Sequence, residues 1–227
     1  MRLQQLLADL GYLPLRFHAA PRVRTTAATS PDLVPVAPLP GHFVWRYPRL
    51  RPVLGSLWQP RVFTALTRGA IMAFEADHGI PSDGVAGPRV WGALLAAVVR
   101  HDVARRPYDV IQVSMALPET LSVWRAGRVV YRSLANTGIA SRPTQPGVYP
   151  VYARYLSTTM SGTNPDGSHY SDPGVPYVAY FNGGDAVHGF IRGSYGWPQS
   201  LGCVELPYGA AAVVYRYDPI GTLVAVS

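Results

Sequence analysis

The stretch that decides the fold is "HGFIRGSYGWPQSLGCVEL", residues 188 to 206, which contains the only cysteine of the chain, Cys203. His188 opens this stretch, and the residues between the two are rich in glycine and aromatics, so the backbone can turn and return the thiol to the imidazole. A cysteine becomes a strong nucleophile when a neighbouring base or positive charge favours its thiolate. The stretch therefore predicts a loop that carries a nucleophile, Cys203, and its general base, His188.

Two other interpretations stay open on residue type alone. A lone cysteine is commonly a small buried hydrophobe rather than a catalyst. His169, Asp172 and His188 could also assemble into a metal site on β loops, although no compact ligand motif supports one. A single cysteine excludes both an intrachain disulfide and a multi-cysteine zinc site.

The sequence around this stretch has the period of two that is typical of β-strands. The segments that alternate or run apolar are "DVIQVSM", "LSVWR", "RVVYRSLA", "VYPVYARYL" and "VPYVAYF". One later segment, "PYGAAAVVYRY" at 207–217, favours a helix with Pro207 in its first turn. We therefore expect a mainly β domain over 108–227, with Cys203 on a loop before that helix.

The first hundred residues instead show helical periodicity. "LQQLLADLGYLPL" places leucines on one face before Gly11, which ends the helix. "VFTALTRGAIMAFEADH" at 62–78 places Phe63, Leu66 and Phe74 near one stripe, and "RVWGALLAAVV" follows Pro88. These patterns predict a small helical domain.

Residues 20–60 interrupt this helical pattern. They hold too many prolines for a regular helix, so we expect a long ordered loop. Its aromatic anchors would be Phe43, Trp45, Tyr47 and Trp58. "HDVARRP" at 101–107 is predicted to be a polar linker. The fold class is therefore α+β multidomain, with a small helical domain over 1–103 followed by the mainly β domain over 108–227.

Composition narrows the class of partner. The 227 residues include 20 Lys+Arg and 13 Asp+Glu, a net charge of +7 that favours an anionic surrounding. No block of basic residues and no nucleic-acid module is present, so nucleic acid is not expected. No apolar run is long enough for an integral membrane segment, and residues 1–20 lack the features of a signal peptide, so no export signal is visible in this sequence.

Two ordered sets of motifs resemble known families. "PTQPGVYPV" at 143–151, "HG" at 188–189 and "SLGCVEL" at 200–206 together resemble the L,D-transpeptidase (YkuD-type) catalytic domain of bacterial cell-wall synthesis. "AIMAFEADHGIPSDGVAGPRVWGAL" resembles the small peptidoglycan-binding domain attached to bacterial cell-wall enzymes. The alternative for this second stretch is a helical packing module without a ligand.

The first resemblance implies a role for each matching residue. Cys203 would be the nucleophile and His188 its base, and a backbone carbonyl near Gly189 would hold the imidazole tautomer. Gly202 and Cys203 would donate backbone N–H groups to the oxyanion, while Ser200 would shape the loop.

The resemblance assigns two more residues to the substrate side. Met160 and Tyr170 would form a lid or the wall on the donor side. On residue type alone, Met160 is equally well explained as core filler and Tyr170 as a strand aromatic.

Two positions depart from the family pattern. Leu201 stands where the family has a histidine, which removes one polar contact from the site. Glu205 stands where the family has an arginine or asparagine. Glu205 either pairs with Arg192 or Arg216 as a structural ion pair, or alters which stem peptide is accepted.

The resemblance implies a cysteine-dependent acyltransferase that acts on peptidoglycan stem peptides. A Cys203 thioester would form with release of D-alanine, and an acceptor amine would resolve it into a cross-link. No metal or organic cofactor is needed, and the place of action would be extracytoplasmic, in the cell wall or periplasm. The alternatives are an L,D-carboxypeptidase, in which water is the acceptor, and a wall-binding protein without turnover.

Overall fold

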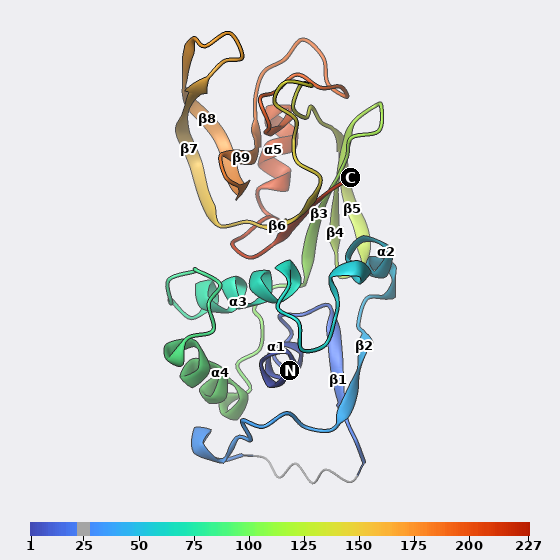
Figure 1. Ribbon diagram of the computed structural model, residues 1–227, viewed down its shortest axis with the longest axis vertical. Coiled ribbons are helices and arrows are strands. Elements are labelled where there is room, and N and C mark those ends of the chain that lie inside the picture. Colours follow the sequence, from blue (N-terminus) through green and yellow to red (C-terminus); the bar gives the residue numbers. More distant parts are fainter. Residues whose placement is uncertain (22–27) are drawn as a thin grey trace. The chain divides into compact units, whose positions relative to one another are not determined.

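A computed structural model describes residues 1–21 and 28–227. The chain divides into two compact units, Met1–Tyr108 and Asp109–Ser227 (Figure 1). The predicted fold class is confirmed, since helices dominate the first unit and strands the second. No helix in the described ranges is long and apolar enough to span a membrane.

The longer helices described in the first unit lie at the places that the periodicity predicts. They are α1 (Arg2–Asp9), α3 (Ala65–Asp77) and α4 (Pro88–Arg100). Their apolar faces meet in a core where Leu6, Leu94 and Phe74 are fully buried. Phe63 is a correction, because it lies before α3 and is 57% exposed instead of joining the buried stripe.

The prediction of a long loop over residues 20–60 is wrong for much of that segment. The segment contributes β2 (Gly41–Trp45), which pairs antiparallel with β1 (Leu15–Ala19). Short helical turns follow or precede this strand: η1 (Pro31–Leu33), η2 (Pro48–Leu50), α2 (Arg51–Leu54) and η3 (Gly55–Leu57). Prolines are compatible with these turns because they stand in the first turn, where a backbone N–H has no intrahelical partner. Residues 22–27 of the predicted loop lie outside the described residues.

Aromatic anchoring of this segment is confirmed for Phe43, Trp58 and Tyr47, and the Tyr47 ring stacks on that of Tyr108 with centroids 6.4 Å apart. The rings of Phe43 and Trp58 meet with centroids 4.8 Å apart, and Phe43 also contacts Phe17 across the two strands. These contacts hold the segment against its own unit.

Two sheets form the second unit. The five-stranded sheet has the order β5-β4-β3-β11-β6, from β3 (Asp109–Ser114), β4 (Thr120–Arg125), β5 (Arg128–Leu134), β6 (Gly147–Pro150) and β11 (Leu223–Val226). The four-stranded sheet has the order β10-β9-β8-β7, from β7 (Ala153–Thr163), β8 (His169–Asn182), β9 (Asp185–Gly189) and β10 (Val204–Leu206). Neighbouring strands run antiparallel except for β11 with β3 and β10 with β9, which are parallel.

Residues from both sheets and from α5 (Tyr208–Val214) share one apolar core. Ile111, Val204 and Val214 are fully buried in it and come from β3, β10 and α5. Figure 1 shows α5 (red) beside β9, and the two elements are in contact. Pro207 is the N-cap of α5, one residue earlier than the predicted first-turn position. The core therefore fixes both ends of β10, and Cys203 immediately precedes this strand.

Candidate active site

The parallel pairing of β9 with β10 brings the two ends of the decisive stretch together. In this register Val204 lies opposite Val187, and Glu205 lies opposite His188. Cys203 is therefore placed at the start of β10, beside the strand that carries the histidine. Cys203 and His188 both line one cavity of about 590 Å³.

The imidazole of His188 is held in one tautomer. Its Nδ1 lies 3.1 Å from the carbonyl oxygen of Gly189, and because a carbonyl only accepts, Nδ1 carries the proton. The other nitrogen, Nε2, then has the free lone pair of a base. The ring is 3% exposed, and burial lowers the pKa of His188, so the neutral form is favoured.

The thiol of Cys203 is protonated at rest. Burial raises its pKa to about 12, and the carboxylates of Asp185 and Glu205 act in the same direction. A backbone hydrogen bond from Ala186 opposes them. Sγ lies 3.9 Å from the carbonyl oxygen of Gly184, which accepts the thiol proton weakly. The pair therefore rests as a neutral thiol and a neutral imidazole.

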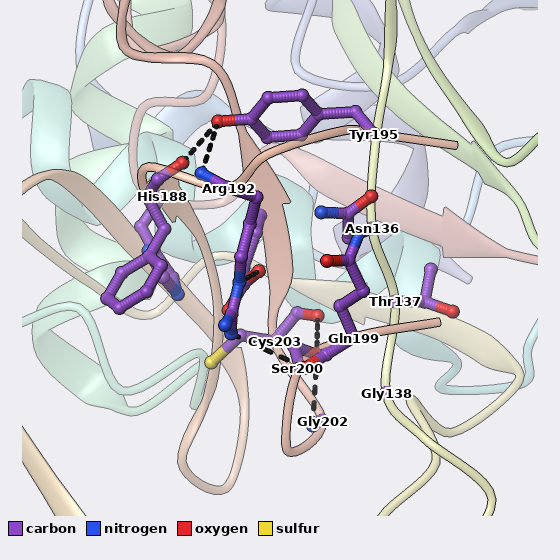
Figure 2. A network of polar contacts seen from close by, with 12 residues as sticks. Asn136, Thr137, Gly138, His188, Arg192, Tyr195, Gln199, Ser200, Gly202 and Cys203 are labelled. Atoms are coloured by element: carbon purple, nitrogen blue, oxygen red, sulfur yellow. Dashed lines mark hydrogen bonds and ion pairs between the residues drawn. The ribbon is translucent and has the colours of Figure 1, made fainter. Parts of the chain in front are cut away.

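Ser200 organises the loop that carries the thiol. Its Oγ donates to the carbonyl of Cys203 at 2.5 Å and accepts the N–H of Gly202 at 3.2 Å (Figure 2). Gly202 adopts φ +120°, a conformation that favours glycine, and a Cβ there would collide with the carboxylate of Asp185. The predicted loop-shaping contact of Ser200 is present, but it occupies the Gly202 N–H that was predicted to bind an oxyanion.

Thr144 ties this loop to the segment before β6. Its Oγ1 accepts the N–H of Gly138 at 2.9 Å and donates to the carbonyl of Gly202 at 2.7 Å. Thr144 is 1% exposed, so both hydrogen bonds are shielded from water. This threonine belongs to the motif at 143–151, but the sequence alone does not indicate its role.

A buried carboxylate directly before β4 supports the same region. Glu119 accepts the backbone N–H of Thr137 at 2.6 Å and its hydroxyl at 2.7 Å. The carbonyl of Thr137 in turn accepts the N–H groups of Gln199 and Ser200. Glu119 thereby fixes the start of the cysteine loop, and local sequence gave no signal of this.

Of the two pairings predicted for Glu205, the structure contains the one with Arg192. Arg192 donates Nε to Oε2 at 2.8 Å and Nη2 to Oε1 at 2.7 Å, a two-point ion pair. Its guanidinium also lies 4.7 Å from the ring centroid of Phe190. Arg216 is exposed. The acidic side chain at this position is therefore neutralised by an arginine from the β9–β10 loop.

The structure gathers most of the predicted site residues on the cavity wall. The wall includes Cys203, His188, Ser200, Leu201, Glu205, Met160 and Tyr170. Gly189 and Gly202 are buried and do not line it. Met160 and Tyr170 come from the β7–β8 hairpin, so that hairpin supplies one side of the cavity. Among the described residues, no group of three or more His, Cys, Asp or Glu could hold a metal, and the alternative site at His169, Asp172 and His188 is not assembled.

Residues 108–226 match the L,D-transpeptidase catalytic domain (YkuD). This chain belongs to the L,D-transpeptidase family. Residues 59–94 match a putative peptidoglycan-binding domain, so the N-terminal resemblance is supported for that part of residues 1–103.

Solved L,D-transpeptidase structures resemble part of this chain. An L,D-transpeptidase from Mycobacterium smegmatis is 23% identical with TM-score 0.48, and the match covers 53% of this chain and 59% of that chain. L,D-transpeptidase 3 from Mycobacterium tuberculosis is 23% identical with TM-score 0.48, covering 53% of this chain and 61% of that one. The catalytic domain of the E. faecium L,D-transpeptidase is 25% identical with TM-score 0.48, covering 54% of this chain and 99% of that chain.

The chain thus spans about 60% of the length of the mycobacterial structures. No curated protein matches the sequence. The assignment to the L,D-transpeptidase family therefore rests on the family match over the second unit.

Proposed function

We propose that this chain is an L,D-transpeptidase that forms peptidoglycan cross-links through a thioester on Cys203. The observation that carries the proposal is the geometry of the cavity wall, where a thiol and a tautomer-fixed neutral imidazole lie together. A neutral imidazole is the form of histidine that can accept a proton near neutral pH.

In the first step, His188 Nε2 takes the proton of Cys203 as Sγ attacks the carbonyl carbon before the terminal D-alanine. The bond between that carbon and the D-alanine nitrogen breaks, and the imidazolium returns the proton to the leaving amine. The Cys203 N–H donates to the oxyanion, since Ser200 already engages the N–H of Gly202. A thioester and free D-alanine result.

In the second step, the side-chain amine of a diamino acid on another stem attacks the thioester carbon. His188 accepts a proton from that amine, the carbon–sulfur bond breaks, and Cys203 recovers its proton. A new amide joins the two stems. The same intermediate attacked by water gives a tripeptide, which is the L,D-carboxypeptidase alternative.

The raised pKa of Cys203 favours a second candidate, a wall-binding protein without turnover. A thiolate is the nucleophilic form of cysteine, and this thiol is disfavoured as a thiolate at rest. The transpeptidase is the better proposal because Ala186 and His188 both favour removal of the proton, through a hydrogen bond to sulfur and a basic nitrogen respectively.

The test is incubation of the full chain, with Cys203→Ala beside it, in purified disaccharide tetrapeptide, with products followed by mass spectrometry. We expect dimers that lack one D-alanine from the unmodified protein only. Tripeptide alone would replace the proposal by the carboxypeptidase. No product, together with sedimentation of the protein on cell-wall sacculi, would replace it by the binding protein.

We further propose that residues 1–103 hold the protein on peptidoglycan in an extracytoplasmic compartment, while residues 108–227 are catalytic. The match of residues 59–94 and the net charge of +7 support this, because the wall polymer is anionic. A chain that lacks residues 1–103 and keeps its strand content by circular dichroism should lose sacculus binding while still turning over soluble tetrapeptide. Equal loss of both would refute this division of roles.

A further inference from the structure

The cavity wall carries two arginines, Arg142 and Arg192, and their charges are used differently. Arg192 forms its two-point ion pair with Glu205 and also donates to the carbonyl of Gln199 at 3.3 Å. Glu205 is 4% exposed, so a nearly dry carboxylate cancels the charge of Arg192. Arg192 therefore stabilises the loop, and its charge is not free to bind an incoming anion.

Arg142 is held by its backbone alone. Its N–H donates to the carbonyl of Ile139 at 2.9 Å, and Ile139 donates in turn to the carbonyl of Ser200. The part of the chain that the structure describes offers the Arg142 guanidinium no hydrogen bond and no ion pair. An exposed arginine with a fixed backbone and unused donors is suited to binding an anion.

The segment that carries Arg142 is fixed to the nucleophile. Thr144, two residues further on, donates to the carbonyl of Gly202, and Gly202 directly precedes Cys203. Gly138, at the start of the segment, bridges to Ser200. The guanidinium therefore projects from a segment whose position is set by the cysteine loop itself.

The donor that the proposed function requires brings a negative charge into this cavity. The carboxylate of the terminal D-alanine is only two bonds from the nitrogen that leaves, so it must enter the cavity whenever the carbonyl reaches Cys203. The remaining charged groups on the wall, Asp172 and Asp185, are acidic and repel it. A carboxylate taken out of water needs a charged or hydrogen-bonded partner, and the fork of an arginine matches its two oxygens.

We propose that Arg142 binds the terminal carboxylate of the donor stem peptide and thereby selects donors that end at that position. This inference rests on the proposed function. Arg142 is then a residue that determines donor specificity, whereas the Arg192–Glu205 pair positions the loop.

The experiment compares two donors, the disaccharide tetrapeptide and the same compound with its terminal carboxylate converted to a carboxamide. The unmodified full-length chain should use the carboxylate donor with a kcat/KM about 10- to 100-fold higher, the range expected for a charge-assisted hydrogen bond. Arg142→Ala should lower kcat/KM for the carboxylate donor by about that factor and leave the carboxamide donor unchanged. Arg142→Lys should recover part of the preference because it keeps the charge but not the fork.

Arg128→Ala is the matched control, since Arg128 is an exposed arginine on β5 that does not line the cavity. It should keep the full preference between the two donors. Thermal unfolding of each variant checks that the folds are equal, and Arg142 is exposed, so its removal creates no cavity.

The outcomes separate the two proposals. Turnover of both donors with the same preference in the unmodified protein and in Arg142→Ala would overturn the role of Arg142 and leave the transpeptidase standing. An equal fall for both donors in Arg142→Ala would overturn it too, because a carboxylate contact cannot slow the carboxamide. No turnover of either donor by the unmodified protein would overturn the proposed function, and the role of Arg142 with it.

Discussion

Thr144→Val tests whether the cysteine loop depends on one buried hydroxyl. Valine keeps the shape of threonine but removes the oxygen that accepts from Gly138 at 2.9 Å and donates to Gly202 at 2.7 Å. Both backbone groups belong to buried residues, so each is left without its partner. A buried polar group that loses its hydrogen bond costs about 1–3 kcal/mol, so the two together cost about 2–6 kcal/mol.

This cost should appear as a lower unfolding temperature of the second unit. For a unit of this size, 1 kcal/mol corresponds to about 3 °C or more, so we expect Tm to fall by at least about 6 °C in differential scanning calorimetry of the full chain. Turnover of the tetrapeptide should also fall, because Gly202 carries the neighbouring Cys203. Thr144→Ser keeps the hydroxyl and should lose much less of both.

Two results would refute this reasoning. A Tm of Thr144→Val within about 2 °C of the unmodified protein would mean that water or another donor replaces the hydroxyl. An equally large fall for Thr144→Ser would mean that the methyl packing, and not the hydrogen bonds, stabilises the loop.

Three further predictions concern other groups. Burial raises the pKa of Cys203 to about 12, so its alkylation by iodoacetamide at pH 8 should be more than about 100-fold slower than that of free cysteine. The alkylation rate, followed by mass spectrometry, should still increase above pH 10. A rate that reaches a plateau below pH 9 would contradict this prediction. Burial also raises the pKa of Glu75 to about 7, so its contribution to stability is fully present below pH 4.5 and is lost as the pH rises through 7. Urea unfolding at pH 5 and pH 8 should show a smaller difference for Glu75→Gln, whose amide oxygen can still accept the N–H of Gly84; an unchanged difference would assign the pH dependence to other groups. Arg192→Met should lower the free energy of unfolding by about 1–3 kcal/mol, because it leaves the carboxylate of Glu205 buried without its partner. In urea unfolding, the double variant Arg192→Met, Glu205→Gln should lose less stability than the sum of the losses of the two single variants. Losses that simply add would show that the two side chains do not couple.

Local pattern was enough to predict the elements whose residues follow one period over a continuous segment. The helix after Pro88 and the strand that contains Val178 are both of this kind. The β1–β2 pairing was missed because its partners, such as Phe17 and Phe43, are separated by a long segment and surrounded by prolines. Pairing across such a distance depends on tertiary packing, and residue propensity does not report it.

The residues of the candidate site also differ in how far the sequence predicts them. The pairing of Cys203 with His188 was predicted from the ordered motifs, because on residue type alone a buried structural cysteine was also open. Glu205 allowed two pairings, and only the folded loop distinguishes Arg192 from Arg216. The role of Thr144 depends on a contact with Gly202 across 58 positions, which no local spacing predicts.

The shielding of the Cys203 thiol has a consequence for its chemical durability. Because burial raises the pKa of Cys203, only a small fraction of the molecules carries the thiolate at pH 7. Peroxide and disulfide reagents react with the thiolate, so the resting protein resists oxidation to sulfenic acid and mixed disulfides. In the proposed mechanism, the lone thiol is thus protected from oxidation until a donor peptide brings the carbonyl that it would attack.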